Sequence, residues 1–270
     1  MSENLMRFIT ILVIVSLIGT IVILGNELSL IIVASLISSY AFYEWITLTS
    51  KSRIYILLFL ILITSLYLFP LISVRYLSLI TLCFWIPLII LMFFFTDLLK
   101  YLINKFSIIT GFFLITPFFY YLVNFFIITD NFTGNLFLLD NKYYLLLFIV
   151  LLSTIDISSY LSGKIFGSLK IVPNISPNKT MEGYFGGYIS TVIIFIIFSE
   201  LSGNLWEFFD ILYLTLLIFL AFSGDLFMSL VKRTYEIKDT GNLLPGHGGL
   251  LDRLDSYFPS MPLFFLWIMI

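Results

Sequence analysis

Long apolar segments separated by short polar ones make up most of the chain. Most of these segments are close to the ~20 residues that a helix needs to cross a bilayer. They lie at Phe8–Leu24, Leu28–Leu48, Ile54–Ile72, Tyr76–Phe95, Ser107–Ile128, Tyr143–Gly163, Tyr184–Leu201 and Phe208–Val231. A last run, Tyr257–Ile270, is too short for a straight crossing at ~1.5 Å per residue. The pattern predicts an all-α polytopic membrane protein with about eight or nine transmembrane helices and no separate soluble domain.

The composition supports the membrane class. Hydrophobic residues make up 60% of the chain and charged residues 11%, whereas a soluble domain has about 25% charged residues. A net charge of −2 gives no indication of nucleic-acid binding. Cys83 is the only cysteine, so neither a disulfide framework nor a Cys-based metal site is available. The first run is interpreted as a membrane helix because no A-x-A-type cleavage site follows it.

The basic residues indicate the orientation. If the N-terminus lies in the cytoplasm and the runs alternate in direction, the external loops hold only Arg75 and Lys142 of the 14 Lys and Arg residues. Such a bias follows the positive-inside rule. We therefore expect a multi-pass protein of the cell inner (cytoplasmic) membrane, with its polar segments facing the cytoplasm.

The chain divides into two regions of different chemical content. Residues 1–142 are expected to pack as transmembrane helices with little chemical signal, and residues 143–270 to form a catalytic region with its active site at the cytosolic face. In the first region, Glu44 beside Trp45 is interpreted as an interfacial carboxylate, and the four Trp residues as interfacial anchors. Asp97, Lys100 and Lys105 are expected in a solvated cytosolic loop.

The first polar patch of the second region contains Asp156, which lies inside an apolar run, ~10 Å from its cytosolic end. An ionisable group at such a depth usually faces a cavity or a partner, and an ion pair with Lys164 is the structural alternative. Downstream, Ser176-Pro177 fits a helix start. Lys179 and Thr180 would then lie in the first turn, where backbone N–H groups can meet an anion.

Three glycines follow this predicted helix start, Gly183, Gly186 and Gly187. They allow a close approach, either by a neighbouring helix or by a phosphate. Helix packing is the commoner cause of such glycines.

The second polar patch, Ser223–Ser256, reads SGDLFMSLVKRTYEIKDTGNLLPGHGGLLDRLDS. Asp225, Ser229 and Lys232 are spaced i, i+4, i+7 and share one helical face. Pro and Gly residues surround His247, the only histidine, which favours a tight turn with free N–H groups. Carboxylates without Cys suit Mg²⁺ bound together with substrate phosphates, and neighbouring Lys and Arg residues suit a polyphosphate.

The second patch resembles the signature of the phosphatidate cytidylyltransferases, also called CDP-diacylglycerol synthases. The pattern S-x-x-K-R-x4-K-D-x5-P-x-H-G-G-x-x-D-R-x-D is met by Ser229, Lys232, Arg233, Lys238, Asp239, Pro245, His247, Gly248, Gly249, Asp252, Arg253 and Asp255. The first patch is similar to two further motifs of that family, D-x-x-A-Y-x-x-G-[RK]-x-F-G and S-P-x-K-T-x-E-G-x-x-G-G. Departures such as Ser159 in place of Ala affect packing rather than chemistry. The resemblance covers roughly residues 151–256.

The resemblance implies transfer of a cytidylyl group from CTP to phosphatidic acid, giving CDP-diacylglycerol and pyrophosphate in phospholipid biosynthesis. It implies Mg²⁺, assigned to Asp225 and Asp252, and a second cation, for which K⁺ is one candidate. The residues expected to take part directly in the reaction are Lys232, Arg233, Asp239, Arg253 and Asp255. The residues expected to bind substrate are Asp156, Ser176, Lys179, Thr180, Ser229, His247, Gly248 and Gly249.

Two alternative functions compete with this interpretation. Another Mg²⁺-dependent membrane transferase for phospholipids would also use Asp clusters, but the D-G-x-x-A-R spacing of the CDP-alcohol type is absent. An ion-coupled transporter would use Asp156 and Asp225 as an ion pathway, but it would place its site near the midplane and often show repeats. The expected partners are CTP, phosphatidic acid and membrane lipids, with no nucleic acid. The oligomeric state stays open, with a homodimer as one alternative.

Overall fold

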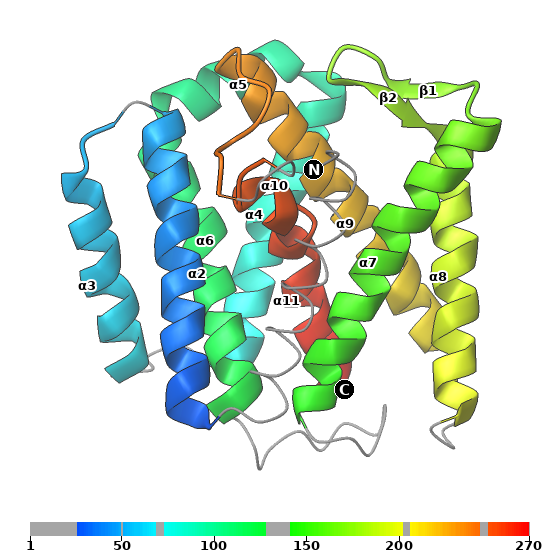
Figure 1. The fold of residues 1–270 in the computed structure, drawn as a ribbon, viewed down its shortest axis with the longest axis horizontal. Coiled ribbons are helices and arrows are strands. Elements are labelled where there is room, and N and C mark those ends of the chain that lie inside the picture. The colour runs from blue at the N-terminus through cyan, green and yellow to red at the C-terminus, as the bar shows by residue number, and fades with distance from the viewer. Residues whose placement is uncertain are drawn as a thin grey trace, which may run out of the picture.

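The computed structural model describes residues 26–49, 51–68, 73–127, 141–201, 206–243 and 248–269. In this part the chain is almost entirely helical (Figure 1). The helices are α2 (Glu27–Leu48), α3 (Ile54–Leu68), α4 (Val74–Phe94), α5 (Thr96–Lys105), α6 (Ser107–Ile127), α7 (Asn141–Phe166), α8 (Met181–Leu201), α9 (Phe208–Thr234), α10 (Leu251–Leu254) and α11 (Tyr257–Ile268). The strands are β1 (Lys170–Val172) and β2 (Ser176–Thr180). The predicted first crossing, Phe8–Leu24, lies outside the described residues.

Six helices of the described part are long and apolar enough to cross a membrane, namely α2, α4, α6, α7, α8 and α9. Their limits lie within a few residues of the predicted apolar runs, and α3 supplies a shorter apolar helix. Local caps fix some of the ends. Asn26 accepts a hydrogen bond from the Ser29 amide (2.9 Å) before α2, and Glu207 and Asp210 form a capping box before α9. The polytopic helical fold is therefore confirmed.

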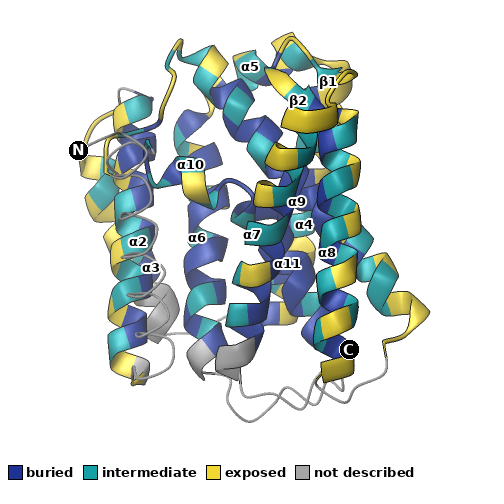
Figure 2. Cartoon of the chain, turned by 45° about the vertical axis from the view of Figure 1, so that its right-hand side comes forward, coloured by how far each residue is buried: buried dark blue, intermediate teal, exposed yellow. Residues whose placement is uncertain are grey.

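The helices are arranged around α11. In Figure 1, α2, α3 and α6 lie on one side and α7 and α8 on the other, and α11 contacts α4, α6 and α9 in the interior. Phe264 and Phe265 of α11 are fully buried, and the Phe265 ring stacks on Tyr121 of α6 with centroids 5.0 Å apart. Figure 2 shows α11 buried along most of its length, whereas α8 presents exposed residues on its outer face.

The last apolar run occupies only part of the depth of the bundle. α11 begins beside Gly224 of α9, where an added Cβ would lie 2.8 Å from Pro259. It ends beside Asp210, whose carboxylate accepts a hydrogen bond from Trp267 Nε1 (2.9 Å). Gly224 lies ten residues before the end of α9, which corresponds to ~15 Å. Residues 248–256, just before α11, therefore lie within the bundle, where buried backbone groups need internal hydrogen-bond partners.

The polar connections gather at one end of the bundle. In Figure 1, α5, the β-hairpin and the end of α9 lie at the same end. The prediction of a loop around Asp97, Lys100 and Lys105 was wrong, because these residues belong to helix α5. Leu99 and Ile103 are buried one turn apart, so an apolar stripe on this short segment stabilises a helix.

The predicted helix start at Ser176 was also wrong. Ser176–Thr180 forms β2, which pairs antiparallel with β1, and α8 begins at Met181. Pro177 disfavours the helical conformation for the residue before it, which explains the extended backbone of Ser176. The cap of α8 is Thr180, whose hydroxyl accepts a hydrogen bond from the Gly183 amide (3.2 Å).

The tryptophans differ from the expected interfacial anchors. Trp45, Trp85 and Trp267 are buried, and among the four only Trp206 is exposed. Trp45 donates from Nε1 to the Ser107 carbonyl (2.7 Å) and so joins the end of α2 to the start of α6. Most of these side chains therefore anchor helices to one another.

The glycines at the start of α8 serve helix packing. A Cβ at Gly183 would lie 2.8 Å from the Ser159 carbonyl oxygen, and one at Gly187 would overlap the Ser159 side chain. A Cβ at Gly186 would likewise overlap the Ser162 side chain. Of the two roles left open by the sequence, close approach of α7 and α8 is the one these contacts support.

We expect Gly183→Ala to destabilise the protein by about 1–3 kcal/mol, because the obstructing atom is backbone and the helices must move apart. Thermal unfolding in detergent measures the effect. Ile193→Ala, on an exposed position of α8, is the control and should unfold near the wild-type temperature. A Gly183→Ala protein as stable as the wild type would show that the α7–α8 contact is looser than described.

Candidate active site

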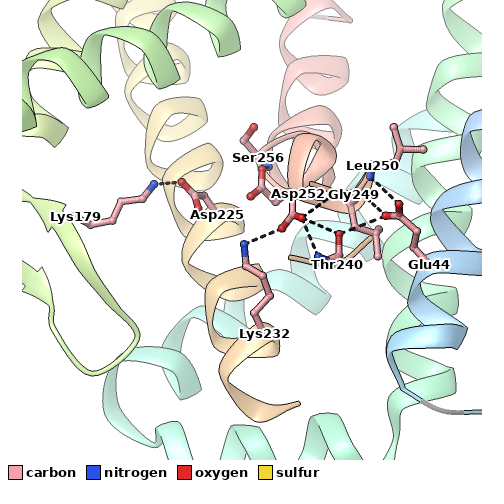
Figure 3. Close-up of polar contacts among 11 residues, drawn as sticks. Glu44, Lys179, Asp225, Lys232, Thr240, Gly249, Leu250, Asp252 and Ser256 are labelled. Carbon is pink, nitrogen blue, oxygen red and sulfur yellow. Dashed lines mark hydrogen bonds and ion pairs between the residues drawn. The ribbon is translucent and has the colours of Figure 1, made fainter. Parts of the chain in front are cut away.

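Charged side chains from four elements meet near the polar end of the bundle. Figure 3 shows Lys179 from β2, Asp225 and Lys232 from α9, Asp252 from α10 and Glu44 from α2. They form a row that runs from the hairpin across α9 to α2. The site is therefore built by segments that are distant in the sequence.

The first ion pair of this row joins Lys179 to Asp225. Both side chains are about three-quarters buried, and Lys179 Nζ lies 5.1 Å from the centroid of the Phe222 ring. Burial lowers the pKa of Lys179, and the negative charges of Asp255 and Asp156 partly oppose this shift. The pair fixes the hairpin to α9 and keeps a cation next to Asp225.

The second ion pair joins Lys232 Nζ to Asp252 Oδ1 (2.7 Å). The other oxygen of Asp252 faces three donors: the Thr240 amide (2.9 Å), the Thr240 hydroxyl (3.0 Å) and the Gly249 amide (3.1 Å). Burial raises the pKa of Asp252, but Lys232 and the backbone donors outweigh it and lower the pKa overall. Asp252 is therefore held as an anion.

A third carboxylate, Asp255, has a different environment. It is buried, and its Oδ1 accepts a hydrogen bond from the Ser256 amide (2.8 Å). Burial, followed by the charge of Asp156, raises the pKa of Asp255 to about 7. Asp156 of α7 is thus close enough to act on both Asp255 and Lys179, which brings the first polar patch of the sequence to the second.

A cavity of about 120 Å³ lies beside the second ion pair. Its polar lining consists of two hydroxyls and three cationic side chains, contributed by Ser176, Ser229, Lys232, Arg233 and Lys238. Ile175 and Ile237 complete the lining. Because several cations and hydroxyl donors converge on one hollow, the cavity suits a phosphate group.

The remaining predicted residues take different positions. Thr180 is buried and caps α8, so its visible role is structural. Gly248 has φ of +80°, a conformation that favours glycine, and a Cβ there would lie 2.9 Å from Asp252 Oδ2. The same Cβ would lie 3.3 Å from Asp239 Oδ1, and Arg253 is an exposed residue of α10. His247 lies outside the described residues.

One member of the site, Glu44, was missed. Its side chain is buried, and the two carboxylate oxygens accept hydrogen bonds from the amides of Leu250 and Leu251 (both 2.9 Å). The expectation of an interfacial carboxylate was wrong, because the side chain is buried and hydrogen-bonded to backbone amides more than 200 residues away in the sequence. The cost of placing a carboxylate near an apolar run was the only signal available, and it does not identify a partner.

The proposed metal ligands are separately paired in the structure. Asp225 faces Lys179 and Asp252 faces Lys232. Within the described ranges, no group of three or more His, Cys, Asp or Glu side chains is arranged to hold a metal ion. The carboxylate oxygens are of the kind that Mg²⁺ prefers, and Mg²⁺ is commonly bound by one or two carboxylates together with substrate phosphates. The donor set therefore fits such an ion in kind.

The fold and the site together define a polytopic helical membrane protein with a phosphate-compatible, charged site toward one end of its bundle. The family model described as "Cytidylyltransferase family" matches residues 5–270. The chain therefore belongs to the cytidylyltransferase family.

Relatives are similar to part of the chain. A phosphatidate cytidylyltransferase of Bacillus subtilis is 43% identical over 120 residues, 44% of each chain. One of Staphylococcus epidermidis is 39% identical over 127 residues, 45% of this chain and 47% of the relative. The uncharacterized protein YnbB of Escherichia coli is 46% identical over 113 residues, 42% of this chain and 38% of the relative. The chain thus matches less than half of the length of each of these relatives.

Proposed function

We propose that the protein transfers a cytidylyl group from CTP to phosphatidic acid, releasing pyrophosphate and forming CDP-diacylglycerol for phospholipid synthesis. The observation that carries the proposal is the cavity, in which Ser176 of one motif meets Ser229, Lys232 and Arg233 of the other. Family membership and the phosphatidate cytidylyltransferases of Bacillus subtilis and Staphylococcus epidermidis, to which the chain is similar, support it.

The reaction makes modest demands on acid–base chemistry. A phosphate oxygen of phosphatidic acid is already anionic at neutral pH, so it attacks the α-phosphorus of CTP without a strong base, and pyrophosphate leaves as the P–O bond to it breaks. The protein must bring two anions together in line and neutralise the charge that grows on the leaving group. Lys232, Arg233 and Lys238 would hold phosphates in the cavity. Lys179, on the hairpin, would contact a substrate phosphate.

Mg²⁺ would be held by Asp225 and Asp252, and a second cation such as K⁺ by a nearby carboxylate from among Asp156, Asp239 and Asp255. When bound, Mg²⁺ supplies positive charge to the phosphate oxygens. The support for this assignment is that both carboxylates already attract a cation, the ammonium of a lysine. Chelation of divalent cations should abolish turnover, and full activity in the presence of a chelator would remove the metal from the proposal.

The site is proposed to face the cytoplasm of a cell whose inner membrane holds the protein, because CTP is cytosolic. The gathering of α5, the hairpin and the end of α9 at one end supports a shared side (Figure 1). Cysteines introduced at Lys100 and Lys238 in a Cys83→Ser background should both react only with reagents that reach the cytoplasm. Labelling of Lys238→Cys from outside would contradict the orientation.

We expect Arg233→Ala to raise the KM for CTP about 10- to 100-fold, the effect of removing one charge-assisted contact worth roughly 1.5–3 kcal/mol. Because Arg233 lines the cavity, we assign this contact to a substrate phosphate. Arg233→Lys should recover part of the loss, since it keeps the charge but not the planar guanidinium. Initial rates over a range of CTP concentrations measure the effect. An unchanged KM would exclude Arg233 from the phosphate site.

The direct test of the proposed function is release of pyrophosphate from CTP by the purified protein with and without phosphatidic acid. We expect release to depend on the lipid, with no substitution by inorganic phosphate. Equally fast release without a lipid phosphate would contradict the proposal.

A further inference from the structure

We infer that Glu44 is a positioning residue that holds the turn at residues 248–252 in the conformation that presents Asp252 to the active site. The geometry of this turn stands on the contacts of the described residues alone. Its consequence for catalysis rests on the proposed function.

The backbone just before Asp252 is fixed from both sides by carboxylates. The Gly249 amide donates to Asp252 itself, and the next two amides, of Leu250 and Leu251, donate to Glu44. Each oxygen of Glu44 accepts one of these hydrogen bonds, with N···O distances of 2.9 Å in both cases. Three successive N–H groups are therefore satisfied by two side chains, which leaves none of the three without a hydrogen-bond partner.

Thr240 links the two carboxylates. Its hydroxyl lies 3.0 Å from Asp252 Oδ2 and 3.4 Å from Glu44 Oε2. A hydroxyl has one proton, and the shorter distance favours donation to Asp252. Glu44 is therefore bound mainly by the two amides, and its charge lies close to the group that hydrogen-bonds Asp252.

The fit around Glu44 depends on two glycines. A Cβ at Gly249 would lie 2.7 Å from Glu44 Oε2 and 2.6 Å from the Gly241 nitrogen. A Cβ at Gly241 would lie 2.8 Å from Glu44 Cδ. No side chain can therefore be added at either position without displacing the carboxylate. Gly241 and Gly249 therefore both lie against the Glu44 carboxylate.

The carboxylate is carried by a rigid element. Trp45, the next residue, is fully buried and donates a hydrogen bond to the Ser107 carbonyl, so the end of α2 is fixed to α6. α2 can therefore act as a fixed support for the turn. A carboxylate suits this role because each of its oxygens accepts a hydrogen bond from one backbone amide. An amide side chain in the same place would direct an NH₂ group at one of the two N–H donors.

The test compares Glu44→Gln with the wild type in lipid nanodiscs, by hydrogen exchange of the whole protein and by turnover of CTP with phosphatidic acid. We expect peptides covering residues 248–252 to exchange at least tenfold faster, and peptides of α7 and α8 to be unchanged. We expect kcat to fall about tenfold or more, with a smaller change in the KM for CTP, because the cavity residues do not contact Glu44. Glu200→Gln, at an exposed end of α8, is the control and should behave as the wild type.

Thr240→Val is a milder second variant, which keeps the backbone donor to Asp252 but removes the hydroxyl. It should accelerate exchange of the same turn, and its effect on kcat should combine with that of Glu44→Gln less than additively, because both act through Asp252. Wild-type exchange at the turn in both variants would overturn the inference. Equal acceleration in every helix would also overturn it, since Glu44 would then support the fold as a whole. If the wild type itself does not turn over CTP, the proposed function fails, while the exchange data still decide the role of Glu44.

Discussion

Asp252→Asn is expected to lower turnover by about 100-fold or more in a protein that remains folded. One oxygen of Asp252 pairs with Lys232, and the other faces three donors from Thr240 and Gly249. An amide of the same size keeps one oxygen and directs an NH₂ group either at the ammonium or at the cluster of donors. The ordered turn and the position of Lys232 at the cavity should both be disturbed.

Steady-state kinetics with CTP and phosphatidic acid measure this effect. Asp97→Asn is the matched control, because Asp97 is almost fully exposed and its pair with Lys100 spans one turn of α5. That control should keep wild-type turnover, as exposed pairs contribute little. Near-wild-type turnover of Asp252→Asn would mean that Asp252 has no part in the reaction.

Asp225→Asn is expected to have a similar effect, about 100-fold or more, through a different contact. It leaves the ammonium of Lys179, which is partly buried, without its ion-pair partner. Lys179→Ala alone should lower turnover about 10- to 100-fold, since it removes one charge-assisted contact.

The double variant Lys179→Met/Asp225→Asn separates two interpretations of this pair. If the pair only fixes the hairpin to α9, removing both charges should restore much of the turnover, because no unpaired charge remains buried. If both groups act on substrate or on a cation, the double variant should be as inactive as Asp225→Asn. We predict no recovery, and recovery to near wild type would reduce the pair to a structural role.

The helices of the fold could be predicted because bilayer thickness sets their length. The apolar run predicted at Phe208–Val231 became α9, and that at Leu28–Leu48 became α2, within a few residues. Segments outside the apolar runs were predicted less well. α5 was missed because its apolar stripe is only two buried residues, Leu99 and Ile103, and the hairpin because Ser176-Pro177 also fits a helix start.

The candidate site could be predicted as a set of residues but not as a set of contacts. Motif spacing indicated Asp225, Lys232 and Asp252, whereas the partner of each carboxylate depends on how distant segments pack. The contribution of Glu44 could not be found in this way, because its partners are backbone amides that any sequence would supply. The depth of α11 likewise follows from Gly224 and Asp210 of α9, which only the structure brings to its two ends.

The most direct test of the proposed activity is the identity of the lipid product. Purified protein in vesicles that contain phosphatidic acid would be given CTP, and the lipids analysed by mass spectrometry. We predict a product heavier than phosphatidic acid by one cytidylyl group, formed in equal amount with pyrophosphate and strongly reduced in the Asp252→Asn variant. Consumption of CTP without such a lipid, or the same lipid formed equally well by Asp252→Asn, would contradict the account.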